Sequence, residues 1–189
     1  MAVDAAIKKL QEIISNNKKH TYLNQTVTIR EKISTPLNHV ILSGLGDDVV
    51  AIQFDKIGFG DKTFVDGHKA RKACDAIIFC QLEGEGYILI LDLKSSIPLD
   101  TNHVPQLVSG DCFADYLIAV LNRFEQIKLI KPTNWKRRYF IFHCGNNRRT
   151  TLPLYAQDPP DNTQADKAHI LQVANGKLIP LRKLLHKPL

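Results

Sequence analysis

Residues 75–94 read DAIIFCQLEGEGYILILDLK, and this stretch predicts the centre of a β-sheet. Its two apolar segments, residues 75–82 and 87–94, are rich in Ile and Leu, as is typical of strands that are buried inside a sheet. The residues between them, Glu83-Gly84-Glu85-Gly86, have the glycines of a tight turn. We therefore expect an antiparallel hairpin within a sheet.

The hairpin brings charged residues to its open end. Asp75 begins the first strand and Asp92 lies near the end of the second, at similar separations from the turn. Lys94 follows Asp92 by two positions, so both side chains point to the same face of the strand. Carboxylates at the ends of apolar strands are costly unless they are paired or bind a metal ion. Such residues suit phosphodiester cleavage, although a solvated strand edge without chemistry is the alternative.

The flanking segments predict the order of the other elements. Residues 3–14 have helical apolar spacing, and residues 49–57 (VVAIQFDKI) read as a strand. A helix is expected over residues 105–124, with Pro105 in its first turn, and residues 139–144 (YFIFHC) read as a further strand. The order is helix, strands, helix, strand, which indicates a mixed α/β domain. Residues 22–34 are β-branched and are expected to form either a strand or an extended arm.

The C-terminal part carries a separate turn signal. Asn175-Gly176 lies between HILQV and KLIPL, and Asn-Gly is a strong hairpin signal. We expect one domain over residues 1–189, with a core at about residues 3–145 and a C-terminal hairpin appendage at about residues 156–189. The appendage would serve assembly or substrate recognition.

With Asp75 and Asp92-Leu93-Lys94 in these places, the sequence resembles the PD-(D/E)xK nuclease superfamily. Asp75 matches the first acidic position, and residues 92–94 match the (D/E)xK position. The resemblance implies a restriction-endonuclease-like core (α-β-β-β-α-β), whose mixed central sheet is flanked by helices. It also implies an Mg²⁺-dependent endonuclease in which the two Asp bind the metal, with Mn²⁺ as a possible substitute, and Lys94 assists the attacking water. Cys74 departs from the pattern, because it stands where the family's name has Pro.

The resemblance also implies residues that support the site. Gln106 opens the second helix, where many members have a supporting Gln, and Glu12 is the acidic residue available in the first helix. Glu12 has an alternative, because it can simply pair with Lys8 one helical turn away. Asp55, near the end of the first strand, is a further acidic residue that can approach the cluster. His103 and His143 lie near the expected site elements, although a lone His is more often structural.

The charge balance is compatible with a polyanionic partner. The chain has 25 Lys and Arg against 19 Asp and Glu, which gives a net charge of +6. Basic residues contact phosphates without reading sequence, and we expect nucleic acid, with DNA favoured over RNA. The expected contacts are Lys69, Arg71, Lys72, Arg137 and Arg138. Asp111 and Asp115 on the second helix are expected on a solvated face.

Composition and cysteine spacing exclude other classes. The chain has 189 residues, of which 44% are hydrophobic, and it contains neither a long apolar run nor a signal-peptide core. The four cysteines lack the spacing of a zinc or iron–sulfur site and lie in apolar stretches, so we expect buried thiols in a cytoplasmic protein.

The expected assembly is open. A protein this small that cuts both strands of a duplex would act as a homodimer. Two alternatives are a catalytically silent nucleic-acid-binding module, and a partner-dependent nuclease subunit of a defence or recombination complex.

Overall fold

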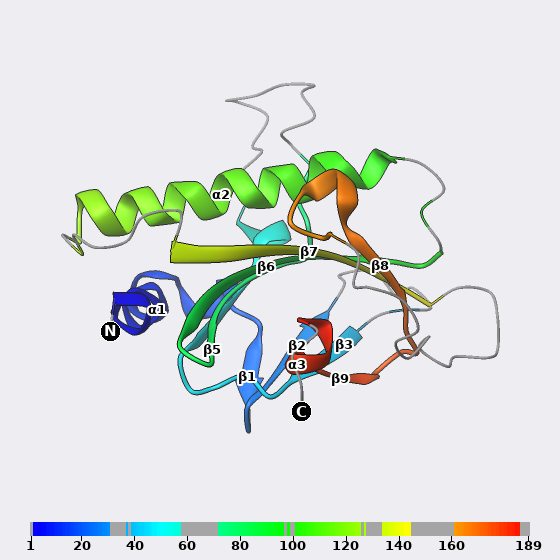
Figure 1. Cartoon of the computed structure of the whole chain (residues 1–189), viewed down its shortest axis with the longest axis horizontal. Helices are drawn as coiled ribbons and strands as arrows, with labels where there is room; N and C mark the ends of the chain where they lie inside the picture. Colours follow the sequence, from blue (N-terminus) through cyan, green and yellow to red (C-terminus); the bar gives the residue numbers. More distant parts are fainter. Residues whose placement is uncertain are drawn as a thin grey trace.

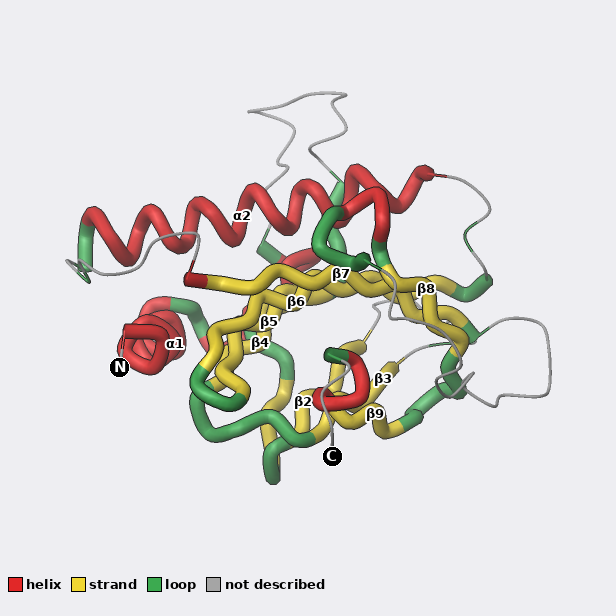
Figure 2. Tube along the Cα trace, in the orientation of Figure 1, coloured by secondary structure: helices red, strands yellow, loops and turns green. Residues whose placement is uncertain are grey.

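The computed structural model describes residues 2–30, 37, 39–57, 72–96, 98, 101–125, 127, 134–144 and 161–185. The molecule is layered (Figures 1 and 2). Helices α1 (Ala2–Ile13) and α2 (Val104–Arg123) cover one face of a five-stranded sheet. A four-stranded sheet and the short helix α3 (Leu181–Leu184) pack on its other face. The predicted mixed α/β class is therefore confirmed.

The five-stranded sheet contains the predicted hairpin at its centre. Its strands are β4 (Val49–Gln53), β5 (Ala76–Leu82), β6 (Glu85–Lys94), β7 (Trp135–His143) and β8 (His169–Gln172), in that spatial order. The pairs β4–β5 and β5–β6 are antiparallel, whereas the pairs β6–β7 and β7–β8 are parallel. Glu83 and Gly84 form the turn with φ of 54° and 81°, the left-handed conformation that a two-residue hairpin needs. α2 supplies the crossover that joins β6 to β7.

The four-stranded sheet was only partly foreseen. It has the order β1 (Thr21–Leu23), β2 (Thr26–Arg30), β3 (His39–Ser43) and β9 (Leu178–Pro180). The strand expected within residues 22–34 is present, but it is split by a turn at Asn24 and Gln25, which have φ of 48° and 57°. No strand was predicted at β3, whose residues alternate half-buried and buried positions.

The predicted C-terminal hairpin is wrong. β8 pairs in parallel with β7, and β9 pairs in parallel with β3, so the two segments lie in different sheets. Asn175-Gly176 does form a turn, in which Gly176 has a φ of 70° and its amide donates to the carbonyl of His39 at 3.0 Å. The Asn-Gly signal specifies this local turn, but available sheet edges decide the pairing. β8 therefore belongs to the five-stranded sheet, and β9 belongs to the four-stranded sheet.

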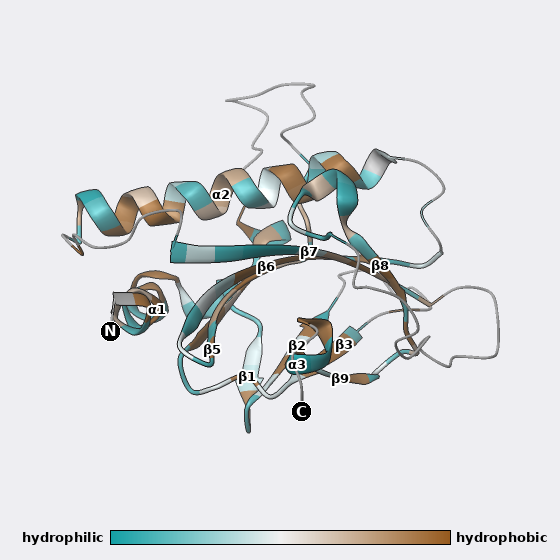
Figure 3. Cartoon of the chain, viewed as in Figure 1, coloured by the Kyte–Doolittle hydropathy of each residue, from teal (hydrophilic) through white to brown (hydrophobic). Residues whose placement is uncertain are grey.

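Strand alternation divides the core into two apolar layers, one on each face of the five-stranded sheet. Figure 3 shows the apolar composition of the central strands in brown. Ile77, Ile88 and Ile90 face the helices, whereas Ile78 and Leu89 face the four-stranded sheet. α2 has the length and apolar composition of a membrane-spanning helix, but 44% of its apolar window is buried inside the structure. The buried residues of α2 pack in the core layer that faces the helices.

Gly110 sets how closely α2 approaches the sheet. A Cβ at this position would lie 2.6 Å from the Sγ of Cys74 and 3.0 Å from the Cγ2 of Ile90. Real Cβ atoms do not come this close, so any larger residue would push the helix away. Glycine in a helix interior lowers stability by about 1 kcal/mol relative to alanine. At Gly110, the close approach of the helix to the sheet explains why glycine is present despite this cost.

The cysteines only partly follow the prediction. Cys74 and Cys80 are buried, Cys144 is half-buried and Cys112 is exposed on α2. All four are free thiols. The prediction of a buried thiol is therefore wrong for Cys112, because the apolar stretch in which it lies presents only one side to the sheet.

Candidate functional site

Asp75 and Asp92 lie side by side at the open end of the hairpin. The register pairs Ala76 with Leu91, which places Asp75 opposite Asp92. The amide of Asp75 donates to the carbonyl of Leu91 at 3.1 Å, and its Oδ2 accepts from the amide of Leu93 at 2.6 Å. The predicted meeting of the start of β5 with the end of β6 is confirmed.

Lys94 joins this pair of strands to the first turn of α2. Its Nζ lies 2.6 Å from Oδ2 of Asp92 and donates to Oε1 of Gln106 at 2.8 Å. Asp92 is 2% exposed, and it lies on the helix-facing side of β6 together with Ile88 and Ile90. The structure thus brings together predicted site residues from β6 and α2. We call Asp75, Asp92, Lys94 and Gln106 the carboxylate–lysine cluster.

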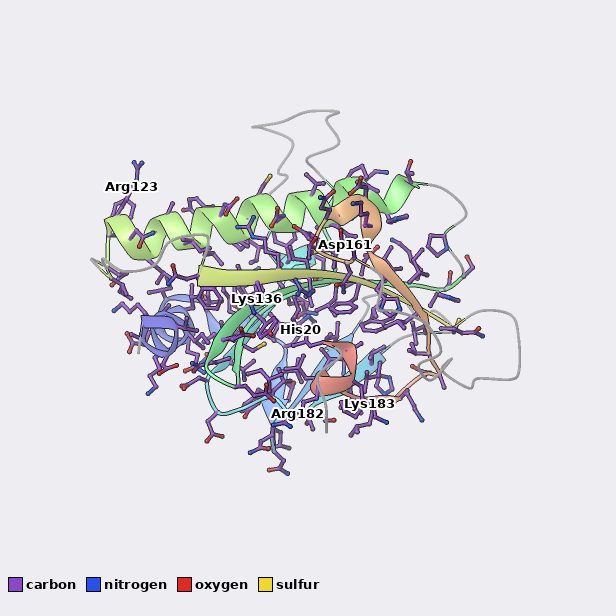
Figure 4. All side chains as sticks on the ribbon, in the orientation of Figure 1. His20, Arg123, Lys136, Asp161, Arg182 and Lys183 are labelled. Atoms are coloured by element: carbon purple, nitrogen blue, oxygen red, sulfur yellow. The ribbon has the colours of Figure 1, made fainter. Side chains whose placement is uncertain are left out.

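His20 contacts the cluster from the chain segment just before β1, and sequence reasoning missed it. Its side chain is buried, and its Nε2 lies 3.1 Å from the carbonyl oxygen of Asp75 (His20 is labelled in Figure 4). Burial lowers the pKa of His20 to about 4, so the imidazole is neutral at pH 7 and donates its N–H to this carbonyl. A single His after an Asn- and Lys-rich segment carries no signal that links it to a residue 55 positions away.

Asp55 lies at the same end of the sheet. It follows β4 in a short 3-10 turn (Phe54–Lys56), and β4 ends where Gln53 pairs with Ala76. Burial raises the pKa of the Cys74 thiol well above its usual value, and the charges of Asp92, Asp75 and Asp55 raise it further. The charges of all three carboxylates thus act on this buried thiol, and that of Asp55 contributes least. The expectation that Asp55 approaches the cluster agrees with this placement.

The carboxylates fit a magnesium ion only in part. Among the residues that the structure describes, no three His, Cys, Asp or Glu side chains form a group that could hold a metal ion. Mg²⁺ usually binds through one or two carboxylates and keeps several waters, so the adjacent Asp75 and Asp92 match its minimal protein ligand set. A site that needs three or four protein ligands does not fit.

Glu12 does not belong to this cluster. Lys9 pairs with Glu12 at 3.0 Å and with Glu125 at 3.1 Å, so Glu12 lies near the C-terminal end of α2. Gln106 lies at the other end of this helix, whose 20 residues span about 30 Å. Figure 1 likewise shows α1 beside the far end of α2. The structure therefore does not bring Glu12 to the cluster, because α1 buries its apolar side and leaves Glu12 exposed.

The predicted nucleic-acid contacts are dispersed. Lys69 and Arg71 lie outside the described residues, whereas Lys72 is exposed three positions before Asp75. Arg137 and Arg138 pair in register with Ile88 and Leu89, in the first half of β7, away from the level of Asp92. These two arginines therefore do not adjoin the cluster.

Arg137 is also occupied within the protein. It pairs with Asp111 at 3.0 Å and with Asp115, which ties β7 to α2. Asp111 is half-buried, and burial raises its pKa, so its expected place on a solvated face is wrong. Arg138 donates from Nη1 to the carbonyl of Arg137 at 2.7 Å. We therefore exclude Arg137 from the candidate nucleic-acid surface.

His103 and His143 flank Lys94. His143 on β7 pairs in register with Lys94, and His103 precedes Gln106 by three positions at the start of α2. Both side chains are buried, and burial lowers the pKa of His143. Within the described part of the chain, the Nδ1 of each has no hydrogen-bond partner. They are neighbours of the cluster and make no contact with its carboxylates that defines a role.

Comparisons of the chain with protein-family models, curated proteins and solved structures give no significant match. The candidate site therefore rests on its own geometry.

Proposed function

We propose that the protein is a metal-dependent nuclease with a restriction-endonuclease-like core. The order α1, β4, β5, β6, α2, β7 supports this assignment, as does a sheet in which the first three strands are antiparallel and the fourth runs parallel to the third. β8 and the four-stranded sheet are additions to that core. The PD-(D/E)xK resemblance assigns the same positions to Asp75, Asp92 and Lys94.

One observation carries the proposal. A buried carboxylate, Asp92, lies opposite a second carboxylate, Asp75, and Lys94 beside them is held by Gln106. Two adjacent carboxylates repel one another, and a divalent cation relieves this repulsion. Their placement with an oriented ammonium is costly for a purely structural role, and it suits hydrolysis of a phosphodiester.

The roles follow from the side chains. Asp75 and Asp92 would hold Mg²⁺ or Mn²⁺, which when bound supplies positive charge at the phosphate and acidifies a water. Lys94 orients the attacking water or stabilises charge on the phosphate, and its ammonium is placed for this by Asp92 and Gln106. Gln106 acts by positioning Lys94, whose ammonium it accepts a hydrogen bond from.

The substrate is nucleic acid, with DNA favoured over RNA. The net charge of +6 and the exposed Lys72 next to the cluster support a polyanion at this end of the sheet. Aromatic residues make up 7% of the chain, which favours backbone contacts over the stacking of single-stranded bases.

A cleavage assay tests the proposal. Plasmid, linear duplex, branched DNA and single-stranded RNA are incubated with Mg²⁺, Mn²⁺ or EDTA, using wild type and Lys94→Ala. Lys136→Ala is the matched control, because Lys136 also lies on a strand and pairs with a carboxylate, Glu85, but at the hairpin end.

Metal-dependent cutting that is lost only in Lys94→Ala is the expected result. If no substrate is cut and nucleic acid binds equally well in EDTA, the enzyme is excluded and a silent binding module remains. Cutting that begins only when a cell extract is added would indicate the partner-dependent subunit.

A further inference from the structure

Asp75 is held at its amide, its carboxylate and its carbonyl. The amide donates to Leu91 and the carboxylate accepts from the amide of Leu93, both on β6. The carbonyl accepts from the imidazole of His20, which comes from the opposite side of β5. Asp75 lies one residue before β5 begins and beyond the last pair that β5 makes with β4. On that side, the imidazole of His20 therefore supplies the hydrogen bond that a neighbouring strand would otherwise make with Asp75.

His20 is itself fixed to the sheet. Its amide donates to the carbonyl of Ala51 at 2.8 Å, and the preceding residue, Lys19, forms an isolated antiparallel bridge with Ile52. Both contacts are on β4, the edge strand next to β5. A continuous set of hydrogen bonds thus runs from β4 through His20 to the backbone of Asp75. The side chain is 7% exposed, so water does not compete for this contact.

We propose that His20 is a positioning residue that holds Asp75 in the geometry needed to bind a divalent cation. This inference rests on the proposed function, because it assigns a cation to Asp75. Mg²⁺ demands nearly ideal octahedral geometry, so a small shift of one carboxylate weakens its binding. His20 acts through the backbone of Asp75 and touches neither the substrate nor the cation. The segment between α1 and β1 is therefore part of the site.

Two substitutions separate positioning from packing. His20→Gln retains an N–H donor, whereas His20→Leu fills the space without one. Partners behind metal ligands typically contribute 10–100-fold to metal affinity, so we expect His20→Leu to weaken Mn²⁺ binding by about 10–100-fold. His20→Gln should recover most of the affinity. Ile7→Val, in α1 on the same core face, is the control for a moderate loss of stability without contact with Asp75.

The measurements are the affinity for Mn²⁺ and Mg²⁺ alone by calorimetry, the melting temperature, and the cleavage rate as a function of metal concentration. The rate of His20→Leu should need more metal and approach the wild-type rate at saturation. Equal metal affinity in folded wild type and folded His20→Leu overturns the positioning role while the proposed function stands. Equal losses in the Leu and Gln variants overturn it as well.

The metal affinity and cleavage activity of the wild type test the proposed function separately. If it binds neither metal and cuts none of the substrates, the nuclease proposal fails, and the role of His20 fails with it. If it binds metal and cuts, only the comparison among the His20 variants decides the inference.

Discussion

The two ends of the five-stranded sheet treat charge differently. At the hairpin end, Lys136 pairs with Glu85, both with substantial exposure, and Lys9 pairs with Glu12. At the open end, Asp92 is 2% exposed and lies beside Asp75. Exposed pairs contribute little to stability, whereas a buried carboxylate is costly unless it is paired or binds a metal ion, and here Lys94 is the partner of Asp92. The contrast separates ordinary surface pairs from a candidate site.

The largest effect is expected from Asp92→Asn, compared with Asp115→Asn at an exposed carboxylate. Loss of one group that stabilises the transition state typically lowers the rate by about 10²–10³-fold, and Asp92→Asn removes one of the two proposed metal ligands, so it should abolish most cleavage. Asp115→Asn removes a partner of Arg137 and should leave cleavage unchanged. The rates are measured under single-turnover conditions. Equal activity of the two variants would show that the ends do not differ in function.

The second effect is a pH dependence of stability that His20 produces. The pKa of His20 is about 4 in the folded protein, against an ordinary value of 6.5. Between these two pH values, His20 binds a proton in the unfolded chain but not in the folded protein. The stability contributed by neutral His20 is complete above about pH 6.5 and falls by about 3 kcal/mol as the pH drops to about 4. Asp55 opposes this shift, whereas Lys56 reinforces it.

Urea unfolding of wild type and His20→Gln between pH 7.5 and pH 4 measures this contribution. The wild type should lose more stability than the variant over this interval. Parallel curves for the two proteins would mean that burial does not lower the pKa of His20 in the folded state.

A smaller effect is expected at Gly110, where α2 meets the sheet. Gly110→Ala gains helix propensity but pushes against Cys74 and Ile90, and overpacking of this kind costs about 1–3 kcal/mol. The displaced helix should separate Gln106 from Lys94, so cleavage should fall further than stability alone explains. Ala119→Gly, at an exposed position of the same helix, is the control for stability.

A second substitution sharpens this test. Cys74→Ala removes the sulfur that the new methyl group would meet at 2.6 Å. The double variant should therefore recover activity relative to Gly110→Ala. If it does not, the clash is not the reason that the glycine is required.

The core hairpin and its charged end could be predicted because their signals are local. Strand composition, a glycine turn and the two-residue spacing of Asp92 and Lys94 all lie within residues 75–94. The pairing of β8 and β9 could not be predicted, because Asn175-Gly176 specifies a turn without specifying which sheet edge receives each strand. The turn is present as the sequence predicts, but the strands with which β8 and β9 pair, β7 and β3, determine the architecture.

The supporting residues of the site show the same limit. Gln106 is implied by the resemblance, which places a supporting Gln at the start of the second helix, and it does contact Lys94. Glu12 was predicted by analogy alone, and the packing of α1 takes it to the opposite end of α2. His20 carries no pattern, because its contact is made to a backbone carbonyl and depends on how the segment before β1 crosses β4.

The smallest effect is a test of which acidic residue supports the cluster. Asp55→Asn should weaken Mn²⁺ binding by about tenfold or more, as expected for a charged group behind the metal ligands, because Asp55 follows β4 at the end of the sheet where Asp75 and Asp92 lie. Glu12→Gln should be indistinguishable from wild type in metal affinity and cleavage, since Glu12 is exposed beside Lys9. Calorimetry with Mn²⁺ alone compares the two matched amide substitutions. An effect of Glu12→Gln equal to that of Asp55→Asn would mean that general surface charge, rather than the arrangement at the open end of the sheet, attracts the cation.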